Sequence, residues 1–162
     1  MLRTLIISLL LFFSVHVYSQ PVSYEQQSFN IFFDSIYKER YLSFKTVEFN
    51  GYSEERQTDF GLYENCFSNA DSIHVMLRMN SFGKEFPKIP ISVSQVKDLK
   101  FKKIRIRSRK RLKVFLYSAN EINQKVYVMI DITKQYSYTD SYIFEFKKDG
   151  RLIRWCKTGV IY

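Results

Sequence analysis

An Asp149-Gly150 pair between two apolar-rich runs near the C-terminal end constrains the fold of this chain more than any other feature. Asp-Gly is among the strongest short-range hairpin signals, because both residues tolerate the positive φ of a two-residue type I′ turn. A turn at this pair predicts these cross-strand neighbours: Phe146 with Ile153, Glu145 with Arg154, Phe144 with Trp155, and Ile143 with Cys156. Opposite charges and apolar side chains then meet, in pairs worth about 0.2–1 kcal/mol each. Because these pairs match in charge or polarity across the two strands, they support the predicted register.

The same register sorts the large side chains of the hairpin onto one face. Successive residues of a strand point to opposite sides of a sheet. The residues that share this face are Tyr142, Phe144, Phe146, Ile153 and Trp155. We therefore expect an aromatic wall on one side of the hairpin.

From residue 101 onward the pattern is that of β-strands separated by short polar connections. The predicted strands cover 101–108, 112–119, 125–133, 141–147 and 151–158, and a weak alternation at 44–49 predicts one more short strand. Consecutive strands with short connections are typical of an antiparallel meander.

A helix of about 20 residues is predicted before the strands, from residue 23 to an end near residues 41–44. Ser23 and Gln26 have the spacing of a capping box, in which the Gln26 side chain reaches back to the N-cap. Apolar residues then recur at helical spacing: Phe29, Phe32, Phe33, Ile36 and Tyr37. Such a stripe usually packs on a sheet, although it is also compatible with a ligand wall. The predicted fold class is therefore α+β: an N-terminal amphipathic helix packed on a curved antiparallel meander of four to six strands.

The final hairpin, Y-I-F-E-F-K-K-D-G-R-L-I-R-W, together with the helix before the strands, resembles the nuclear-transport-factor-2-like superfamily and its cystatin-like relatives. The resemblance covers mainly residues 125–158 and 23–44. It implies a curved sheet that closes around an N-terminal helix. It also implies a family of varied functions, with isomerases, hydratases, ligand-binding and purely structural members.

Residues 1–19 have the pattern of a secretory signal peptide: Arg3, an apolar run from Leu5 to Phe13, and Val17-Tyr18-Ser19 before the expected cleavage. The apolar run is well below the ~20 residues of a membrane-spanning helix. We expect an exported, soluble protein of the periplasm or extracellular space, with residues 20–162 forming one globular domain.

Two cysteines, Cys66 and Cys156, remain in that domain. In an oxidising compartment they are candidates for a disulfide, and two separately buried thiols are the alternative. There is no Cys-x-x-Cys, and His74 is the only histidine after residue 19, so no metal site is expected. No cofactor motif occurs in the sequence.

The net charge of +9 is concentrated in one segment. Ten basic residues lie between Lys97 and Lys113, and only Asp98 opposes them. The candidate anion-binding residues are Lys103, Arg105, Arg107, Arg109, Lys110 and Arg111, the first four on one face of the predicted strand. A row of cations attracts a polyanion, whereas a charged edge strand can also serve only to prevent aggregation. An anionic polysaccharide, lipopolysaccharide or another envelope component is the expected partner. Aromatic residues do not interleave with the basic row, which argues against nucleic acid.

For catalysis the sequence offers only Asp131 and Tyr127, which share one face of strand 125–133. If that face lined an apolar cavity, burial would raise the pKa of Asp131 and make it a general base. The aliphatic face of the same strand is the better candidate for the interior. The function predicted from sequence is a non-catalytic binding or interaction module, and the alternative is a pocket that binds or transforms a small apolar ligand.

Overall fold

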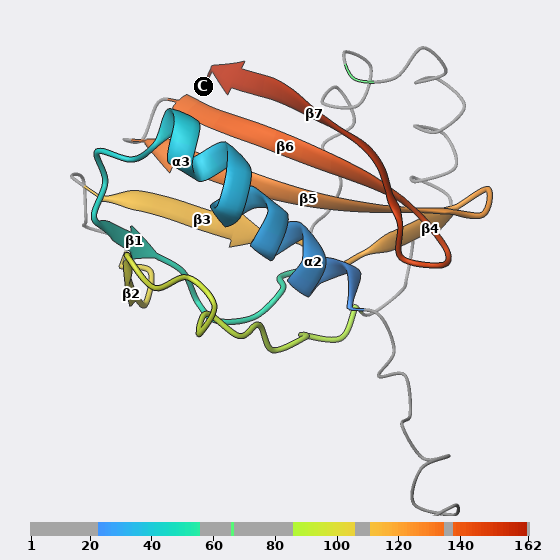
Figure 1. The fold of residues 1–162 in the computed structure, drawn as a ribbon, viewed down its shortest axis with the longest axis horizontal. Coiled ribbons are helices and arrows are strands. Elements are labelled where there is room, and N and C mark those ends of the chain that lie inside the picture. Colours follow the sequence, from blue (N-terminus) through green and yellow to red (C-terminus); the bar gives the residue numbers. More distant parts are fainter. Residues whose placement is uncertain (1–22, 56–65, 67–85, 106–110, 135–137, 162) are drawn as a thin grey trace, which may run out of the picture.

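The computed structural model describes residues 23–55, 66, 86–105, 111–134 and 138–161. A helical segment lies across one face of a seven-stranded sheet (Figure 1), which confirms the α+β class. The predicted signal peptide at 1–19 lies outside the described residues.

The helical segment consists of three consecutive parts: α2 (Tyr24–Ile31), the π-helical turn η1 (Phe32–Ile36) and α3 (Tyr37–Arg40). Ser23 caps it as predicted, because its hydroxyl accepts a hydrogen bond from the Gln26 N–H at 3.2 Å. The Gln26 side chain does not reach back to the cap. It accepts from the Ser92 N–H and donates to the Ser92 carbonyl, so it connects the helix to the loop before β2. The helix ends at Arg40, next to the predicted end near residues 41–44. No helix in the described ranges is long and apolar enough to cross a membrane.

The sheet is mixed, and the predicted purely antiparallel meander of four to six strands is wrong. Its strands are β1 (Thr46–Glu48), β2 (Lys100–Lys102), β3 (Leu112–Leu116), β4 (Asn120–Ile122), β5 (Lys125–Lys134), β6 (Tyr138–Lys147) and β7 (Leu152–Ile161). Their order is β2-β1-β3-β5-β6-β7, with β4 paired to β5. β1 lies between β2 and β3 and runs parallel to both. The meander pattern is kept only from β3 onward, where neighbours are antiparallel.

β3 and β4 lie one after the other along β5. The strand predicted at 112–119 ends earlier, at Leu116, and β4 occupies residues that were predicted to be a connection. Leu116 is opposite Ile130 and Asn120 is opposite Tyr127. Between these two pairs, the β3–β4 side therefore has one residue more than β5. This is a β-bulge, which bends a strand and interrupts its ladder. The turn between β4 and β5 is type I′: Asn123 and Gln124 both have positive φ, of 49° and 63°, and Ile122 pairs with Lys125.

The register predicted for the last hairpin is confirmed for Glu145–Arg154, Phe144–Trp155 and Ile143–Cys156, but its turn is not type I′. The Gly150 N–H donates to the Lys147 carbonyl, and the Lys147 N–H donates to the Arg151 carbonyl. Of the central residues only Gly150 has a positive φ, of 88°. This is a three-residue loop with glycine in the left-handed position. A bulge at Glu145/Phe146 follows, so Phe146 pairs with Leu152 and not with Ile153.

The core lies between the helix and the sheet. The apolar stripe of the helix is buried against three groups of sheet residues: Leu112, Val114 and Leu116 of β3; Val126, Val128, Ile130 and Ile132 of β5; and Tyr142, Phe144 and Phe146 of β6. The aromatic wall predicted for the hairpin exists on β6 and reaches β7 at Trp155, which pairs with Phe144 and whose ring centre is 6.1 Å from that of Tyr142, whereas Ile153 is displaced from it. Ile153 and Trp155 remain 41% and 39% exposed, because β7 is the outer strand and the bulge displaces Ile153.

Candidate anion-binding surface

The edge strand β2 carries the first part of the basic run. Phe101 points to the helix, with its ring 5.4 Å from that of Phe33 and 6.0 Å from that of Phe29. Its neighbours Lys100 and Lys102 therefore point to the opposite face of the sheet, about 7 Å apart, and both are exposed. Lys103 and Arg105 follow directly and are exposed as well.

The strand predicted at 101–108 is shorter than expected. β2 ends at Lys102, and residues 103–105 continue without strand pairing. Three of the six predicted anion-binding residues are therefore placed by the structure, namely Lys103, Arg105 and Arg111. Arg107, Arg109 and Lys110 lie outside the described residues.

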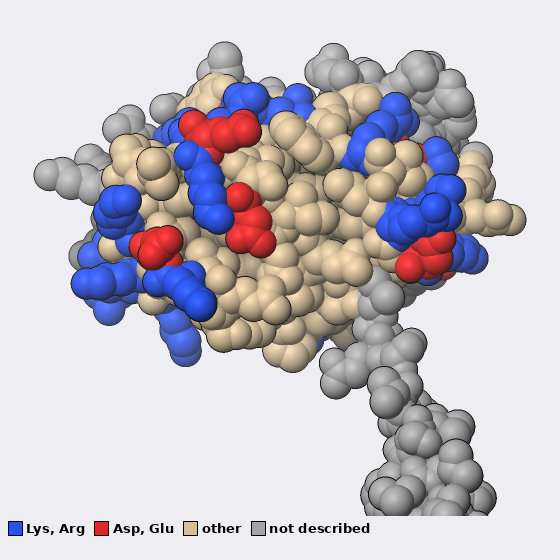
Figure 2. Space-filling model, viewed as in Figure 1, with Lys and Arg blue, Asp and Glu red and all other residues tan. Residues whose placement is uncertain are grey.

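We use the name basic edge for the exposed cations on and around β2: Lys45, Lys97, Lys100, Lys102, Lys103 and Arg105. Lys45 belongs to this group because its carbonyl accepts a hydrogen bond from the Lys100 N–H. In Figure 2 a group of Lys and Arg side chains lies at the end of the molecule where β1 and β2 lie, and further groups lie at the opposite end and along the upper edge. Six positive charges thus share one end of the sheet.

Several cations elsewhere on the sheet form ion pairs with carboxylates. Glu145 binds Lys125 and Arg154, Asp140 binds Lys134 and Lys157, and Glu121 binds Lys148. Within the described ranges, no member of the basic edge has a carboxylate oxygen within 4.0 Å of its charged nitrogen. The positive charge of the basic edge therefore faces solvent, where it raises the local electrostatic potential.

Glu48 of β1 fixes both ends of the segment that links β2 to β3. Its carboxylate is fully buried and accepts the Arg105 N–H at 3.2 Å and the Arg111 Nη1 at 3.2 Å. Asn50 accepts the Ile104 N–H close by. Arg111 is thus engaged in an ion pair, unlike the exposed Lys103 and Arg105. Sequence inspection missed Glu48, because its partners lie more than fifty residues away along the chain.

We expect Glu48→Gln to lower the free energy of unfolding by about 1–3 kcal/mol, since it removes the charge that holds Arg111 while Arg111 keeps access to water. Urea denaturation measures this loss. Glu39→Gln, at an exposed position of α3, is the matched control and should change the stability by less than about 0.5 kcal/mol. Equal losses in both variants would contradict the anchoring role of Glu48.

The structure does not bring the two candidate catalytic residues, Asp131 and Tyr127, into contact. Both side chains lie on the sheet face turned away from the helix, as the aliphatic pattern predicted, but they are four residues apart on β5, about 13 Å. The Asp131 carboxylate accepts hydrogen bonds from Ser141 at 2.5 Å and from Tyr117 at 3.2 Å. Tyr127 lies opposite Glu145, and burial together with this negative charge raises its pKa to about 12. Tyr127 is therefore a neutral phenol at physiological pH.

Two other buried carboxylates on β6 were not recognised from the sequence as centres of polar clusters. Asp140, 1% exposed, accepts a hydrogen bond from the Tyr41 hydroxyl at 2.5 Å, and Tyr41 is 2.8 Å from the Tyr142 hydroxyl. Burial alone would raise the pKa of Asp140, but hydrogen bonds from Lys157, Tyr41 and Tyr138 outweigh it and hold the pKa below its usual value. The pKa of Glu145 is likewise lowered, because Lys125 and Arg154 outweigh its burial. Both carboxylates are therefore ionised and engaged in structural contacts at neutral pH.

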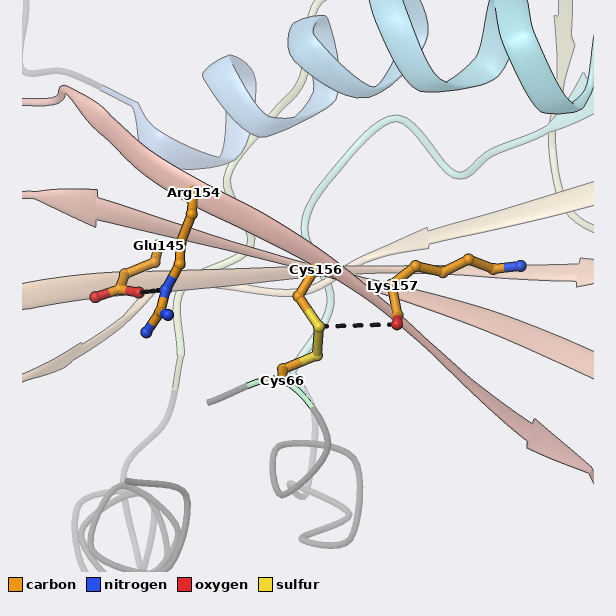
Figure 3. Close-up of a disulfide and its surroundings, with 5 residues drawn as sticks. All are labelled: Cys66, Glu145, Arg154, Cys156 and Lys157. Carbon is orange, nitrogen blue, oxygen red and sulfur yellow. Dashed lines mark hydrogen bonds and ion pairs between the residues drawn. A yellow bond between two sulfur atoms is a disulfide. The ribbon is translucent and has the colours of Figure 1, made fainter. Parts of the chain in front are cut away.

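Cys66 and Cys156 form a disulfide, which resolves the alternative that the sequence left open. Their Cα atoms are 5.7 Å apart, and 90 positions separate them along the chain. Cys156 lies beside Arg154 and Lys157 on β7, and its side chain points away from the helix (Figure 3). The bond ties a residue that precedes β2 to the opposite edge of the sheet.

Among the described residues, no group of three or more histidine, cysteine or acidic side chains is arranged to hold a metal ion. Comparisons with protein-family models, curated proteins and solved structures find no match for this chain. The resemblance to the nuclear-transport-factor-2-like superfamily therefore stays a prediction from the sequence.

Proposed function

We propose that this protein is a non-catalytic module that binds an anionic polysaccharide or another polyanion of the cell envelope through its basic edge. The observation that carries the proposal is a difference in ion pairing between the basic edge and the strands on the other side of the sheet. Lys125, Lys134, Arg154 and Lys157 of β5 and β7 each have a carboxylate partner, while the cations of the basic edge have none within 4.0 Å among the described residues.

The chemistry of the basic edge suits a repeating polyanion. Lysine presents a compact charge on a flexible stem, and several such charges release counterions together when they contact a charged polymer. Glu48 and Asn50 fix the backbone of residues 104 and 105, so the exposed charges are presented from an anchored segment. The disulfide is typical of proteins in oxidising compartments, which supports export and a partner at the cell envelope.

Binding to dextran sulfate, measured against the salt concentration, tests this proposal. Reversing two charges of the basic edge with Lys103→Glu and Arg105→Glu should weaken binding by about tenfold or more at low salt. The slope of log affinity against log salt should also fall by about two, because two fewer counterion-releasing contacts form. Neutral dextran of the same length should not bind.

The matched control reverses one lysine and one arginine elsewhere, with Arg40→Glu and Lys147→Glu. Both residues are exposed and have the same net effect on charge. If the control variant loses as much affinity as the basic-edge variant, binding depends only on net charge and the proposed site is wrong. Equal retention of the wild-type protein on a plain sulfonate exchanger and on the polysaccharide would lead to the same conclusion.

A further inference from the structure

Asn50 and Gly51, just after β1, form the only Asn-Gly pair of the chain. This pair is the dipeptide most prone to lose ammonia from its asparagine. The reaction begins when the backbone nitrogen of the following residue attacks the asparagine side chain, and glycine has no side chain to hinder that attack. Every other asparagine of the chain precedes a residue that carries a side chain.

The structure leaves the attacking nitrogen of Gly51 accessible. Among the residues that the structure describes, the Gly51 N–H donates no hydrogen bond. Apart from the chain neighbours of Gly51, none of their atoms lies within 4 Å of the place that a β-carbon on this residue would occupy. Gly51 also has a positive φ of 87°, where any other residue would be strained. The backbone therefore requires glycine at this position and keeps the reactive pair.

The side chain of Asn50 contacts the middle of the basic edge. Its Oδ1 accepts a hydrogen bond from the Ile104 N–H at 3.4 Å, and its Nδ2 donates to Glu54 Oε1 at 2.6 Å. An N–H that points to the amide oxygen stabilises the negative charge that develops on this oxygen when the amide carbon is attacked. Ile104 lies between Lys103 and Arg105, so a change at Asn50 acts on the segment that presents these two cations.

We propose that Asn50-Gly51 is a site of spontaneous deamidation that weakens the binding of polyanions to the basic edge as the protein ages. The effect on binding rests on the proposed function, whereas the chemistry does not. The Gly51 nitrogen loses its proton to solvent and forms a bond to Asn50 Cγ, while the Cγ–Nδ2 bond breaks and ammonia leaves. Water then opens the cyclic imide to aspartate or isoaspartate. The reaction consumes water and releases ammonia, with no oxidation or reduction.

Either product places a carboxylate where the amide of Asn50 was. Its neighbour is the Glu54 carboxylate, so two like charges replace the present hydrogen bond of 2.6 Å. The new charge also lies beside the Ile104 N–H, where it offsets one cation of the basic edge. Deamidation therefore lowers the positive potential of the basic edge and removes a contact that fixes the turn after β1.

Isoaspartate has a further effect, because it inserts an extra carbon into the backbone. On one side of the Asn-Gly pair the Phe49 N–H donates to the Lys102 carbonyl at 2.8 Å. On the other side the Ile91 N–H donates to the Gly51 carbonyl at 2.9 Å. A longer backbone between these two bonds cannot keep both in their present geometry. The isoaspartate form should therefore also loosen β2, which carries Lys100 and Lys102.

Incubation of the folded protein (residues 20–162) at neutral and at mildly alkaline pH, followed by peptide mass spectrometry, tests the site. The peptide that holds Asn50 should gain the mass difference between an amide and a carboxyl group. The gain should be faster at higher pH, because the attacking nitrogen must lose its proton. The peptide that holds Asn123 is the internal control, since Asn123 is exposed but Gln124 follows it. Asn50→Gln should stay intact at this position, because its longer side chain closes such a ring far more slowly.

Dextran sulfate binding measures the consequence of the modification. The deamidated fraction, separated by ion exchange, and the Asn50→Asp variant should both bind several-fold more weakly than fresh protein. The slope of log affinity against log salt should fall by about one, since one cation of the basic edge is offset. Asn123→Asp is the matched control, because it makes the same charge change in the β4–β5 turn, at the opposite end of the molecule from β2 (Figure 1). It should bind like the wild-type protein.

Two results would overturn the deamidation site: an Asn50 peptide that converts no faster than the Asn123 peptide, or one that converts in urea but not in the folded protein. Undiminished binding by both the deamidated fraction and Asn50→Asp would overturn the effect on the basic edge. Fresh protein that does not bind dextran sulfate would instead overturn the proposed function, while conversion at Asn50 would still be measured by mass. The two failures are therefore distinguishable.

Discussion

Replacing both cysteines, with Cys66→Ser and Cys156→Ser, should lower the free energy of unfolding by about 4 kcal/mol. The disulfide closes a loop across 90 positions, and the chain-entropy account gives a value of this size for so long a loop. Domains of this size are stable by only about 5–15 kcal/mol. We therefore expect a large fall in the urea midpoint, measured on the oxidised wild-type protein and the double variant side by side.

Reduction supplies the control for this prediction. Wild-type protein treated with a thiol reductant should lose as much stability as the double variant, whereas the double variant itself should not respond to the reductant. Wild-type protein whose midpoint is insensitive to reduction would show that the Cys66–Cys156 bond contributes nothing.

The second large effect is expected at Asp140. Asp140→Asn should lower the free energy of unfolding by about 2–3 kcal/mol, since it removes the charge that faces both Lys134 and Lys157 in a site closed by Tyr41, while both lysines keep access to water. Asp34→Asn is the matched control: it removes an exposed ion pair with Lys38 on the helix, and such pairs contribute only about 0.3–0.5 kcal/mol. Urea denaturation at pH 7 compares the two variants.

The difference between wild-type protein and Asp140→Asn should also depend on pH. Because folding lowers the pKa of Asp140, the unfolded chain binds more protons than the native one below the ordinary carboxyl pKa of about 4. The Asp140 carboxylate therefore makes its full contribution to the free energy of unfolding above about pH 4. This contribution is lost as the pH falls through the lowered pKa of Asp140. A gap between the two proteins that stays constant down to the acid limit, or an effect no larger than that of Asp34→Asn, would contradict this account.

The sequence predicts the hairpin register well but not the turn that closes it. Glu145–Arg154 and Ile143–Cys156 each match in charge or polarity, so any one-residue slip would break both pairs. The Asp-Gly pair, in contrast, suits a two-residue turn and a three-residue loop alike. The residues in the type I′ conformation, Asn123 and Gln124, carry no such pair and were placed only within a general connection.

Long-range pairing is where prediction from the sequence fails. The three residues of β1 show weak alternation, and nothing in them indicates parallel partners as distant as β2 and β3. Asp140 was assigned to a polar loop before residue 141, but it lies inside β6 because Lys134, Lys157 and Tyr41 satisfy its carboxylate there. Buried polar groups of this kind become visible only when their partners are placed in space.

The position of β1 also has a consequence for how the chain folds. β5, β6 and β7 are joined by short connections, so their ladders need only small loops to close. β1 must instead insert between two strands that come much later in the sequence, and such non-local contacts form slowly. We expect β5–β7 to gain amide protection first in pulse-labelled hydrogen exchange, and β1 and β2 last. Early protection of β1 would refute this order. An intermediate of this kind would expose the apolar face that the helix covers in the native protein, so the newly made chain would depend on rapid docking of the helix and β1 to escape aggregation.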